Sequence, residues 1–254
     1  MSDFTLVSYK NLLIALLEAN YQPITFEEYF STKKPEKLVV LRHDVDRTPE
    51  NAIKMAKLEN ELNIRASYYY RVVAESYDEH SINEIVRLKH ELGYHYEDLS
   101  LAKGNKQKAL ELFEKHLANF RKFYPVKTMC MHGSPMSKYD NRKLWEVYNY
   151  HDYNIIAEPY FDLNFNKIFY ITDASRSWNN EEVTLRDKVS TKFNYEINHT
   201  KDIIKLLKEE KLPHELMIST HPHNWADGSV EWLKILLWQG FKNQIKKVLV
   251  RKSA

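Results

Sequence analysis

Glycine is scarce in this sequence: it contributes five of 254 residues, where average usage of about 7% would give roughly 18. Because glycine tolerates left-handed backbone and close contact, a chain with so few glycines is expected to keep them where no side chain fits. Gly93, Gly133 and Gly228 each lie within five residues of a histidine. We therefore expect three of the five glycines to mark a functional site.

Other absences exclude whole classes of protein. The single cysteine, Cys130, excludes a disulfide framework and is typical of a reducing compartment. No apolar run reaches the roughly 20 residues of a membrane-spanning helix. The first six residues lack the basic and apolar parts of a signal peptide, so we expect a cytoplasmic protein. The 37 basic residues nearly balance the 35 acidic ones, which argues against nucleic acid as a partner because phosphate binding needs clustered uncompensated cations.

What the chain does contain is a regular alternation of short β-rich runs and longer helical ones. We predict strands at 37–41, 66–73, near 94, and at 127–131, 153–157, 168–172 and 215–219, and helices at 48–63, 82–92, 106–123, 142–148, 201–208 and 231–249. This alternation predicts βαβ units and a parallel sheet, open or closed into a barrel. Two helices before the first strand are interpreted as a short N-terminal helical extension, residues 1–35, packed against a main domain, residues 36–254.

Polar side chains follow four of the predicted strands, where chemistry collects in parallel α/β folds. Asp44 and Asp46 come directly after the first apolar strand, and two residues apart on an extended segment they point the same way. His95, His132 and His221 stand at the ends of later strands. The structural alternative is that Asp44 caps the next helix, that Asp46 pairs with a neighbouring arginine, and that each histidine is a satisfied core residue. Four such strand ends together favour a site.

The order of these segments resembles the polysaccharide deacetylase (NodB-homology) superfamily, from about Leu38 to Trp225. His43-Asp44-Val45-Asp46 is similar to the variant of its first motif in which one residue separates two acids. His90-Glu91-Leu92-Gly93-Tyr94-His95 is similar to its second motif, and Met217-Ile-Ser-Thr-His221 to its last. The resemblance implies a divergent member with a distorted (β/α) barrel, an α/β fold, that removes acetyl groups from sugars with a divalent metal.

Carried over residue by residue, the resemblance implies that Asp44 is the catalytic base and that His221 is the general acid. Asp46 and His95 would bind the metal. The ligand types are compatible with zinc, manganese or iron, or with no metal at all. Where the family has a further histidine ligand, four residues after His95, this chain has Leu99, which cannot bind a metal. The third ligand must then be His132, His223 or Glu97, and we favour His132.

A second departure concerns the arginine that orients the base in the family's third motif. Residues 130–140 contain no arginine, which leaves Lys138 or Arg176 as substitutes.

A rim for substrate is predicted from aromatic and basic residues near the strand ends, since aromatic rings over a polar floor suit a sugar. The candidates are Arg71, Arg176, Trp178, His223 and Trp225. The structural alternative is that Trp178 packs a loop and that Arg176 pairs with Asp173.

Three interpretations of function follow. The first is a metal-dependent hydrolase, a carbohydrate deacetylase acting on an N-acetylated saccharide or a carrier-linked sugar precursor in surface polysaccharide synthesis. The second is a metal-independent hydrolase of cyclic amides, which the same superfamily also contains, using Asp44 and His221 alone. The third is a degenerate barrel that binds a saccharide or a partner protein without turnover. Leu99 and the missing arginine favour the third, and the intact set of Asp44, Asp46, His95 and His221 argues against it.

Overall fold

Seven parallel strands form one sheet in the part of the chain that the structure describes. The computed structural model describes all residues except 1, 32, 134–136, 179–188 and 239–254. The strands are β1 (Gln22–Ile24), β2 (Leu38–Val45), β3 (Ser67–Tyr70), β4 (Glu91–Tyr96), β5 (Met129–Met131), β6 (Phe169–Thr172) and β7 (Glu215–Thr220). Their order is β5-β4-β3-β2-β7-β6, and β1 pairs with the first half of β2. The parallel sheet that the alternation predicts is therefore present.

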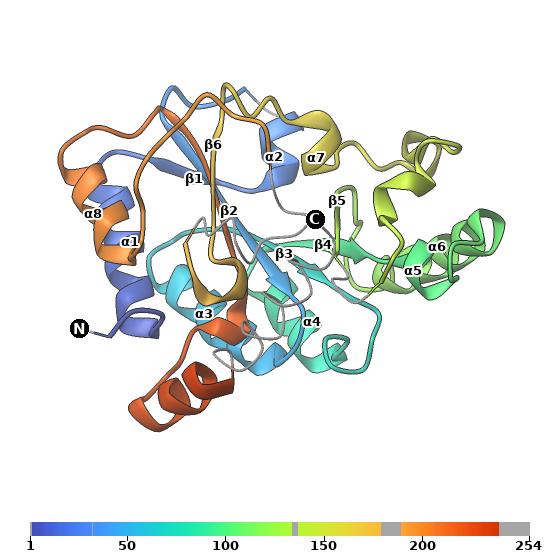
Figure 1. Cartoon of the computed structure of the whole chain (residues 1–254), viewed down its shortest axis with the longest axis horizontal. Coiled ribbons are helices and arrows are strands. Elements are labelled where there is room, and N and C mark those ends of the chain that lie inside the picture. Colours follow the sequence, from blue (N-terminus) through green and yellow to red (C-terminus); the bar gives the residue numbers. More distant parts are fainter. Residues whose placement is uncertain (1, 32, 134–136, 179–188, 239–254) are drawn as a thin grey trace.

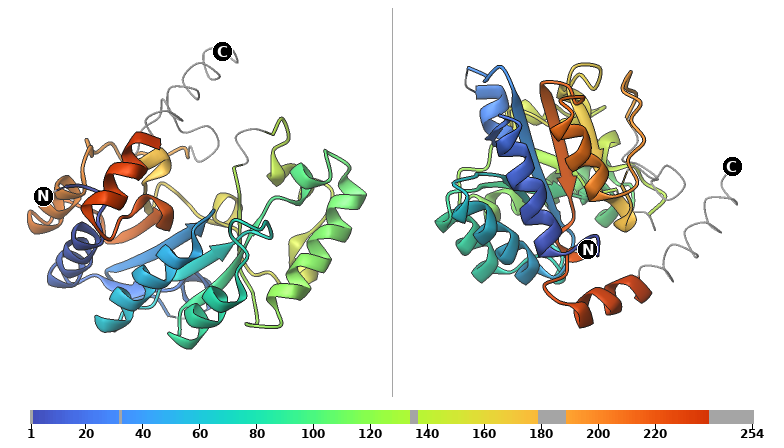
Figure 2. Two further views of the ribbon diagram at one scale, coloured as in Figure 1. Left: turned by 90° about the horizontal axis from the view of Figure 1, so that it is seen from below. Right: turned by 90° about the vertical axis from the view of Figure 1, so that its left-hand side faces the viewer.

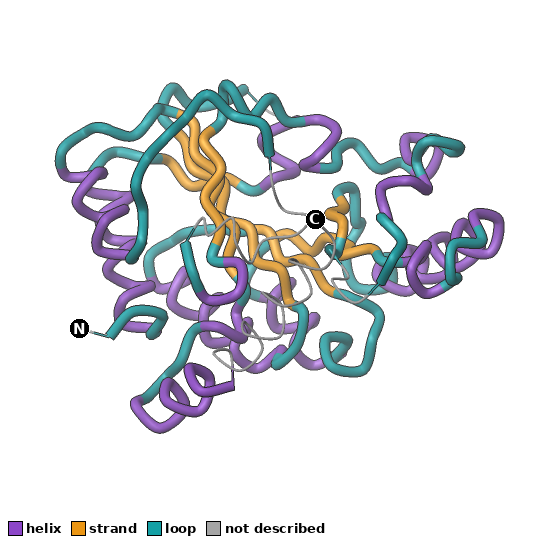
Figure 3. The backbone as a smooth tube through the Cα atoms, viewed as in Figure 1, coloured by secondary structure: helices purple, strands orange, loops and turns teal. Residues whose placement is uncertain are grey.

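Helices surround this sheet (Figure 1). They are α1 (Leu6–Glu18), α2 (Phe26–Ser31), α3 (Pro49–Glu61), α4 (Glu79–Arg87), α5 (Asp98–Leu101), α6 (Lys106–Phe120), α7 (Pro159–Asp162) and α8 (Thr200–Lys208), with 3-10 turns at Asn141–Leu144, Tyr150–Tyr153, Ala174–Arg176 and Pro222–Asn224. Figure 3 shows the strands as a curved band with the helices around it. In the described part of the chain, every helix is too short or too polar to cross a membrane.

Strict alternation of side chains divides the sheet into two buried faces. Val40, Tyr69, Cys130, Tyr170 and Met217, from five strands, form one cluster on the inner face. The residues between them along each strand pack under the helices in the main hydrophobic cluster. Because the inner cluster joins residues of β5 and β6, the two edges of the sheet, the sheet curls around it. The predicted fold class, an α/β fold with a distorted barrel, is confirmed in this open form.

The predicted N-terminal extension contributes to the same core. β1 belongs to the sheet, Phe26 of α2 lies in the inner cluster, and Tyr9 of α1 lies in the main one. The backbone near Thr5 bridges to Ala226, close to the end of the described chain. The described residues of the segment 1–35 are thus built into the fold.

Three predicted elements differ from the structure. The segment 142–148 forms only a 3-10 turn, at Asn141–Leu144. The strand predicted at 153–157 is reduced to a single bridge between Thr128 and Ala157 beside β5. The last helix runs over 229–238, and the rest of the predicted helix to 249 lies outside the described residues.

Behind the inner face, a buried carboxylate fixes the outer side of β2. Glu59 of α3 accepts hydrogen bonds from Tyr68 (2.7 Å) and Tyr9 and contacts His43 Nε2 at 2.7 Å. His43 Nδ1 lies 2.6 Å from the hydroxyl of Thr220 on β7. Burial acts to raise the pKa of Glu59, but the charge and hydrogen bond of His43, together with His90 and Tyr9, outweigh it and hold that pKa below its usual value. This network joins α3 to the two strands that carry Asp44 and His221.

Gly93 is required by packing rather than by backbone conformation. A Cβ atom at this position in β4 would lie 2.3 Å from the Tyr69 ring on the neighbouring strand. We expect Gly93→Ala to lower the free energy of unfolding by about 1–3 kcal/mol, the usual cost of overpacking a core. Urea denaturation measures this, and Gly228→Ala, where the added Cβ meets nothing within 4 Å, is the matched control. Equal stability of both variants would contradict the packing argument.

Candidate functional site

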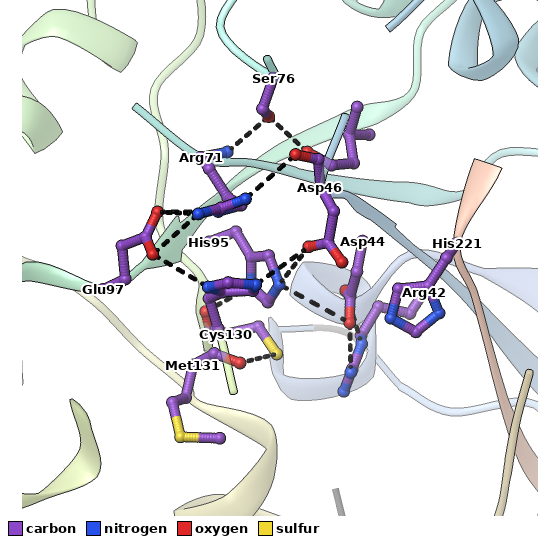
Figure 4. A network of polar contacts seen from close by, with 12 residues as sticks. Arg42, Asp44, Asp46, Arg71, Ser76, His95, Glu97, Cys130, Met131 and His221 are labelled. Carbon is purple, nitrogen blue, oxygen red and sulfur yellow. Dashed lines mark hydrogen bonds and ion pairs between the residues drawn. The ribbon is translucent and has the colours of Figure 1, made fainter. Parts of the chain in front are cut away.

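The inner face of the sheet carries a polar cluster at the carboxyl ends of its strands. Asp44 lies on β2, in line with Val40 of the inner cluster, and His95 lies on β4, two residues after Gly93, which faces Tyr69 of that cluster. Asp46 and His132 follow β2 and β5, and His221 follows β7. Figure 4 shows the side chains of Asp44, Asp46 and His95 turned toward one another. The structure brings together all five residues that the sequence predicts as base, acid and ligands.

Three of these side chains form a group that could hold a metal ion. One ligand atom from each of Asp46, His95 and His132 lies within 4.8 Å of the others. Asp46 Oδ1 is 3.4 Å from His95 Nε2 and 3.5 Å from His132 Nε2. Among the described residues, this buried oxygen finds no hydrogen-bond partner. A carboxylate oxygen without a partner that faces two imidazole nitrogens fits a divalent cation, because Zn²⁺ lies about 2.0–2.2 Å from such ligands.

The contacts behind these ligands fix which nitrogens face the site. His95 Nδ1–H donates to the carbonyl of Cys130 at 2.8 Å, and His132 Nδ1–H donates to Glu97 at 3.0 Å. Glu97 is held in turn by two hydrogen bonds from Arg71, at 2.7 and 2.9 Å. Both histidines therefore present Nε2 to Asp46. Outer partners of this kind are typical of metal-binding histidines.

The surroundings of Asp46 and Glu97 keep both carboxyl groups ionised beside the two histidines. Burial acts to raise the pKa of Asp46, but the charges of His132, His221 and His95 hold it well below its usual value. Burial acts against ionisation of Glu97 too, yet its contacts with His132 and Arg71 lower its pKa to about 2. Buried ionised carboxylates beside imidazole rings attract either protons, which leave the imidazoles charged, or a metal ion, which binds the imidazoles in their neutral form.

Leu99 lies apart from the ligand set. It is on α5 and packs with Ala102, Ala109 and Leu144 in a small apolar cluster. His132 instead supplies the third member of the group, as the sequence analysis favours. Glu97 lies one contact further out, and the group of described ligand atoms does not include His223.

Asp44 is held by an arginine that the sequence analysis did not consider for this role. Arg42 Nε donates to Asp44 Oδ1 at 3.0 Å and Nη2 to Oδ2 at 2.7 Å, and both side chains are buried. Burial acts to raise the pKa of Asp44, and the charges of Arg42, His95 and His221 more than offset it, so this pKa lies below its usual value. The predicted substitutes Lys138 and Arg176 are wrong, because Arg42 already occupies both carboxylate oxygens. The signal that could have identified Arg42 is its position two residues before Asp44 on one strand face.

His221 is paired with Asp173, which follows β6. His221 Nδ1 lies 2.6 Å from Asp173 Oδ1, and the backbone N–H of His221 donates to the same oxygen at 2.9 Å. The indole N–H of Trp225 donates to Asp173 Oδ2 at 2.8 Å. Burial acts to lower the pKa of His221, but the charge of Asp173 and its hydrogen bond raise that pKa to about 10. The pairing of Asp173 with Arg176, weighed as an alternative, is not formed.

The predicted substrate rim is largely wrong. Trp178 and Trp225 are 2% and 0% exposed and pack with Phe4 in an aromatic cluster, so neither offers a ring face to a sugar. Arg176 is buried and donates to the carbonyl of Trp232 at 3.4 Å.

Two rim candidates do lie at the site. Arg71 supports Glu97 and donates to the carbonyl of Asp46 at 3.2 Å, so its described contacts are with the protein itself. The ring of His223 stands edge-on to that of His221, with 5.8 Å between centroids. Substrate contact by Arg71 and His223 stays a prediction.

Comparison with known proteins gives matches in structure alone. No family model matches the sequence, and no curated protein matches it either. A CE4 family pseudoenzyme from Bacillus anthracis is similar at 13% identity and a TM-score of 0.46, over 83% of this chain and 63% of that one. A mutant of a CE4 pseudoenzyme with restored activity gives the same identity and TM-score over 85% of this chain and 65% of that one.

A CE4 domain of a multidomain xylanase, from the hindgut metagenome of Trinervitermes trinervoides, is 12% identical with a TM-score of 0.40, over 83% and 85% of the two chains. The chain spans about two-thirds or less of the length of the pseudoenzyme structures. At such identities and TM-scores these neighbours establish no activity, so the chemistry of the site has to follow from its own residues.

Proposed function

We propose that the chain is a metal-dependent hydrolase that removes the acetyl group from an N-acetylated saccharide or a carrier-linked sugar precursor. One observation carries the hydrolytic part of this proposal. The buried Asp46 oxygen faces two histidine nitrogens, and the carboxylate of Asp44 lies 4.0 Å from one of them, His95 Nε2. A possible ligand set and a separate carboxylate base thus lie together at the carboxyl ends of neighbouring strands. The saccharide is proposed from the resemblance of the motifs.

The residues divide the chemistry between them. Asp46, His95 and His132 would hold the cation, which when bound polarises a carbonyl group and lowers the pKa of water. Asp44 would accept the proton of the attacking water, because Arg42 keeps it ionised and fixed in orientation. Asp44 is bonded to Arg42 and lies outside this group of three ligands. It can therefore act as a base while all three ligands stay on the cation.

His221 would protonate the leaving amine. Its contact with Asp173 keeps it protonated at neutral pH and fixes Nδ1, so that Nε2 is the nitrogen able to donate a proton. A cationic acid and an anionic base at one site are what amide hydrolysis needs, because the nitrogen leaves only after protonation.

The test measures metal and activity together. Purified native protein is analysed for metal content and then assayed for acetate release from free, nucleotide-linked and lipid-linked N-acetylated hexosamines, before and after chelation. We expect about one divalent ion per chain and activity that chelation removes and added metal restores. Activity that survives chelation would select metal-independent hydrolysis instead. Sugar binding without acetate release would select the degenerate barrel.

Removing the outer carboxylate should weaken metal binding without removing a ligand. We expect Glu97→Gln to lower metal affinity by about 10–100-fold, the usual effect of losing a partner behind a metal-binding histidine. Competition with a chromogenic chelator measures it. Glu75→Gln, at an exposed position, is the control and should leave affinity unchanged. Unchanged affinity in Glu97→Gln would remove His132 from the ligand set.

A further inference from the structure

The last described helix, 229–238, presents an apolar surface to solvent. Val230 and Leu237 are 71% and 67% exposed, and Leu233, Leu236 and Trp238 are exposed as well. Five of the eleven exposed large apolar side chains of the described residues thus lie within these ten positions. Val230, Leu233 and Leu237 share one helix face because they are three and seven residues apart. Figure 2 shows this helix projecting from the side of the molecule.

The opposite face of the helix is fastened to the protein. The indole N–H of Trp232 donates to the carbonyl of Asp3 at 2.7 Å, and Arg176 lies over the Trp232 ring, 5.1 Å from its centroid. Glu231 accepts a hydrogen bond from Asn51 at 3.2 Å. These contacts set the rotation of the helix, so the apolar face points outward because of how the helix is docked.

Charge of one sign follows the helix in the sequence. Residues 239–254 contain five of the 37 basic residues of the chain and none of the 35 acidic ones, so the rest of the chain has a formal charge of −3. Exposed leucine and tryptophan on a helix, together with lysine and arginine, are typical of segments that lie in the surface of a membrane.

We propose that the helix 229–238 and the basic segment after it bind the surface of an anionic lipid bilayer. Lysine and arginine side chains are attracted to such a surface, and leucine and valine side chains that become buried in it add the apolar part. A second copy of the chain fits this surface less well, because pairing would bring two basic segments together. Nucleic acid would leave the apolar face exposed to water.

This inference does not rest on the proposed activity, but it bears on the substrate. The helix follows β7 and the turn that carries His221. The bound helix would begin eight residues after His221, so a sugar presented by a lipid carrier would be held near the candidate site.

The test is flotation of the full-length protein with vesicles of phosphatidylcholine alone and of equimolar phosphatidylcholine and phosphatidylglycerol. We expect binding to the anionic vesicles only, weakened by salt that screens the charges. Leu233→Glu combined with Leu237→Glu should weaken binding by about tenfold or more, since two apolar side chains are lost from the buried face. The matched control is Val147→Glu with Phe161→Glu, two exposed apolar positions elsewhere, which should bind as the unchanged protein does.

A second variant tests the charge separately and leaves the described helix intact. Lys246→Gln combined with Lys247→Gln should weaken binding to anionic vesicles and reduce its salt dependence. The proposal is overturned if the protein floats with neither vesicle, or if the control variant loses as much binding as the leucine variant. It is also overturned if sedimentation shows a dimer that the leucine variant dissociates while vesicles are not bound.

Discussion

Asp44→Asn is expected to lower kcat/KM for acetyl release by about 10²–10⁴-fold, the usual contribution of a general base, while metal content stays the same. The amide keeps the shape of the carboxylate but cannot accept a proton from water. Because Asp44 is bonded to Arg42 and stands outside the ligand group of Asp46, His95 and His132, its loss should spare the metal. Steady-state kinetics and elemental analysis on the same preparation measure both effects.

Asp46→Asn is the matched comparison, because it makes the same chemical change two residues away, at a proposed metal ligand instead of the proposed base. It should lose metal and activity together. If Asp44→Asn also lost its metal, Asp44 would be a ligand, and the second possible group of Asp44, His95 and Cys130 would describe the centre better. If Asp44→Asn kept full activity, another group would be the base.

Arg42→Met separates orientation from proton transfer. The charge of Arg42 is the largest influence that lowers the pKa of Asp44, so its removal should raise that pKa. Asp44 would then be protonated at a higher pH, and the acid limb of the kcat/KM profile should move upward. A drop in rate with an unmoved acid limb would leave Arg42 a purely structural role.

The location of the site could be predicted from sequence because it depends on local pattern. Each strand is a short buried run, and side chains alternate along it with a period of two. Val40 of the inner cluster therefore places Asp44, four residues later, on the same face. Because the strands are parallel, the carboxyl ends of β2, β4, β5 and β7 lie at the same edge of the sheet. The predicted base, acid and ligands therefore meet there.

The hydrogen-bond and packing partners of the predicted rim residues could not be predicted, because they depend on contacts between segments far apart in the chain. Trp225, two residues after His223, suggests a substrate rim. Its indole is buried in the core, however, and donates a hydrogen bond to Asp173. Arg176 and Trp178 follow Asp173 closely in sequence, but a turn after β6 directs them toward Phe4 and the helix 229–238. The scarcity of glycine was informative in a different way: Gly93 makes room for Tyr69 and keeps β3 and β4 close beneath the ligands.

At position 99, where the resemblance implies a histidine ligand, this chain has leucine, and in the proposed metal site His132 would replace that histidine. Leu99 fills an apolar cluster below α5, and a charged ligand there would have to be desolvated among alanine and leucine side chains. His132 reaches Asp46 from β5 instead and is oriented by Glu97. With His132 as the third ligand, the proposed site still has one carboxylate and two imidazoles. The leucine at position 99 therefore does not by itself imply that the metal is lost.

Asp173→Asn is expected to shift the alkaline limb of the kcat/KM profile to lower pH by more than one unit. His221 has to be protonated to act as an acid, and it loses its proton as pH rises through its pKa of about 10. Asp173 is the largest of the groups that raise this pKa against burial. With asparagine in its place, burial dominates and the pKa falls, so the rate at pH 9 should drop by about tenfold for each unit by which the new pKa lies below 9.

Stability gives the same prediction a readout that does not depend on catalysis. The pKa of His221 is higher in the folded protein than the ordinary value of about 6.5, so its contact with Asp173 stabilises the fold fully below that pH. The stabilisation is lost as pH rises through about 10. The difference in Tm between the unchanged protein and Asp173→Asn should therefore shrink from pH 6.5 to pH 10, whereas Asp227→Asn, at an exposed acid, should show no such trend. A constant difference in Tm, with an unmoved alkaline limb, would mean that His221 is neutral in the folded protein and cannot be the acid.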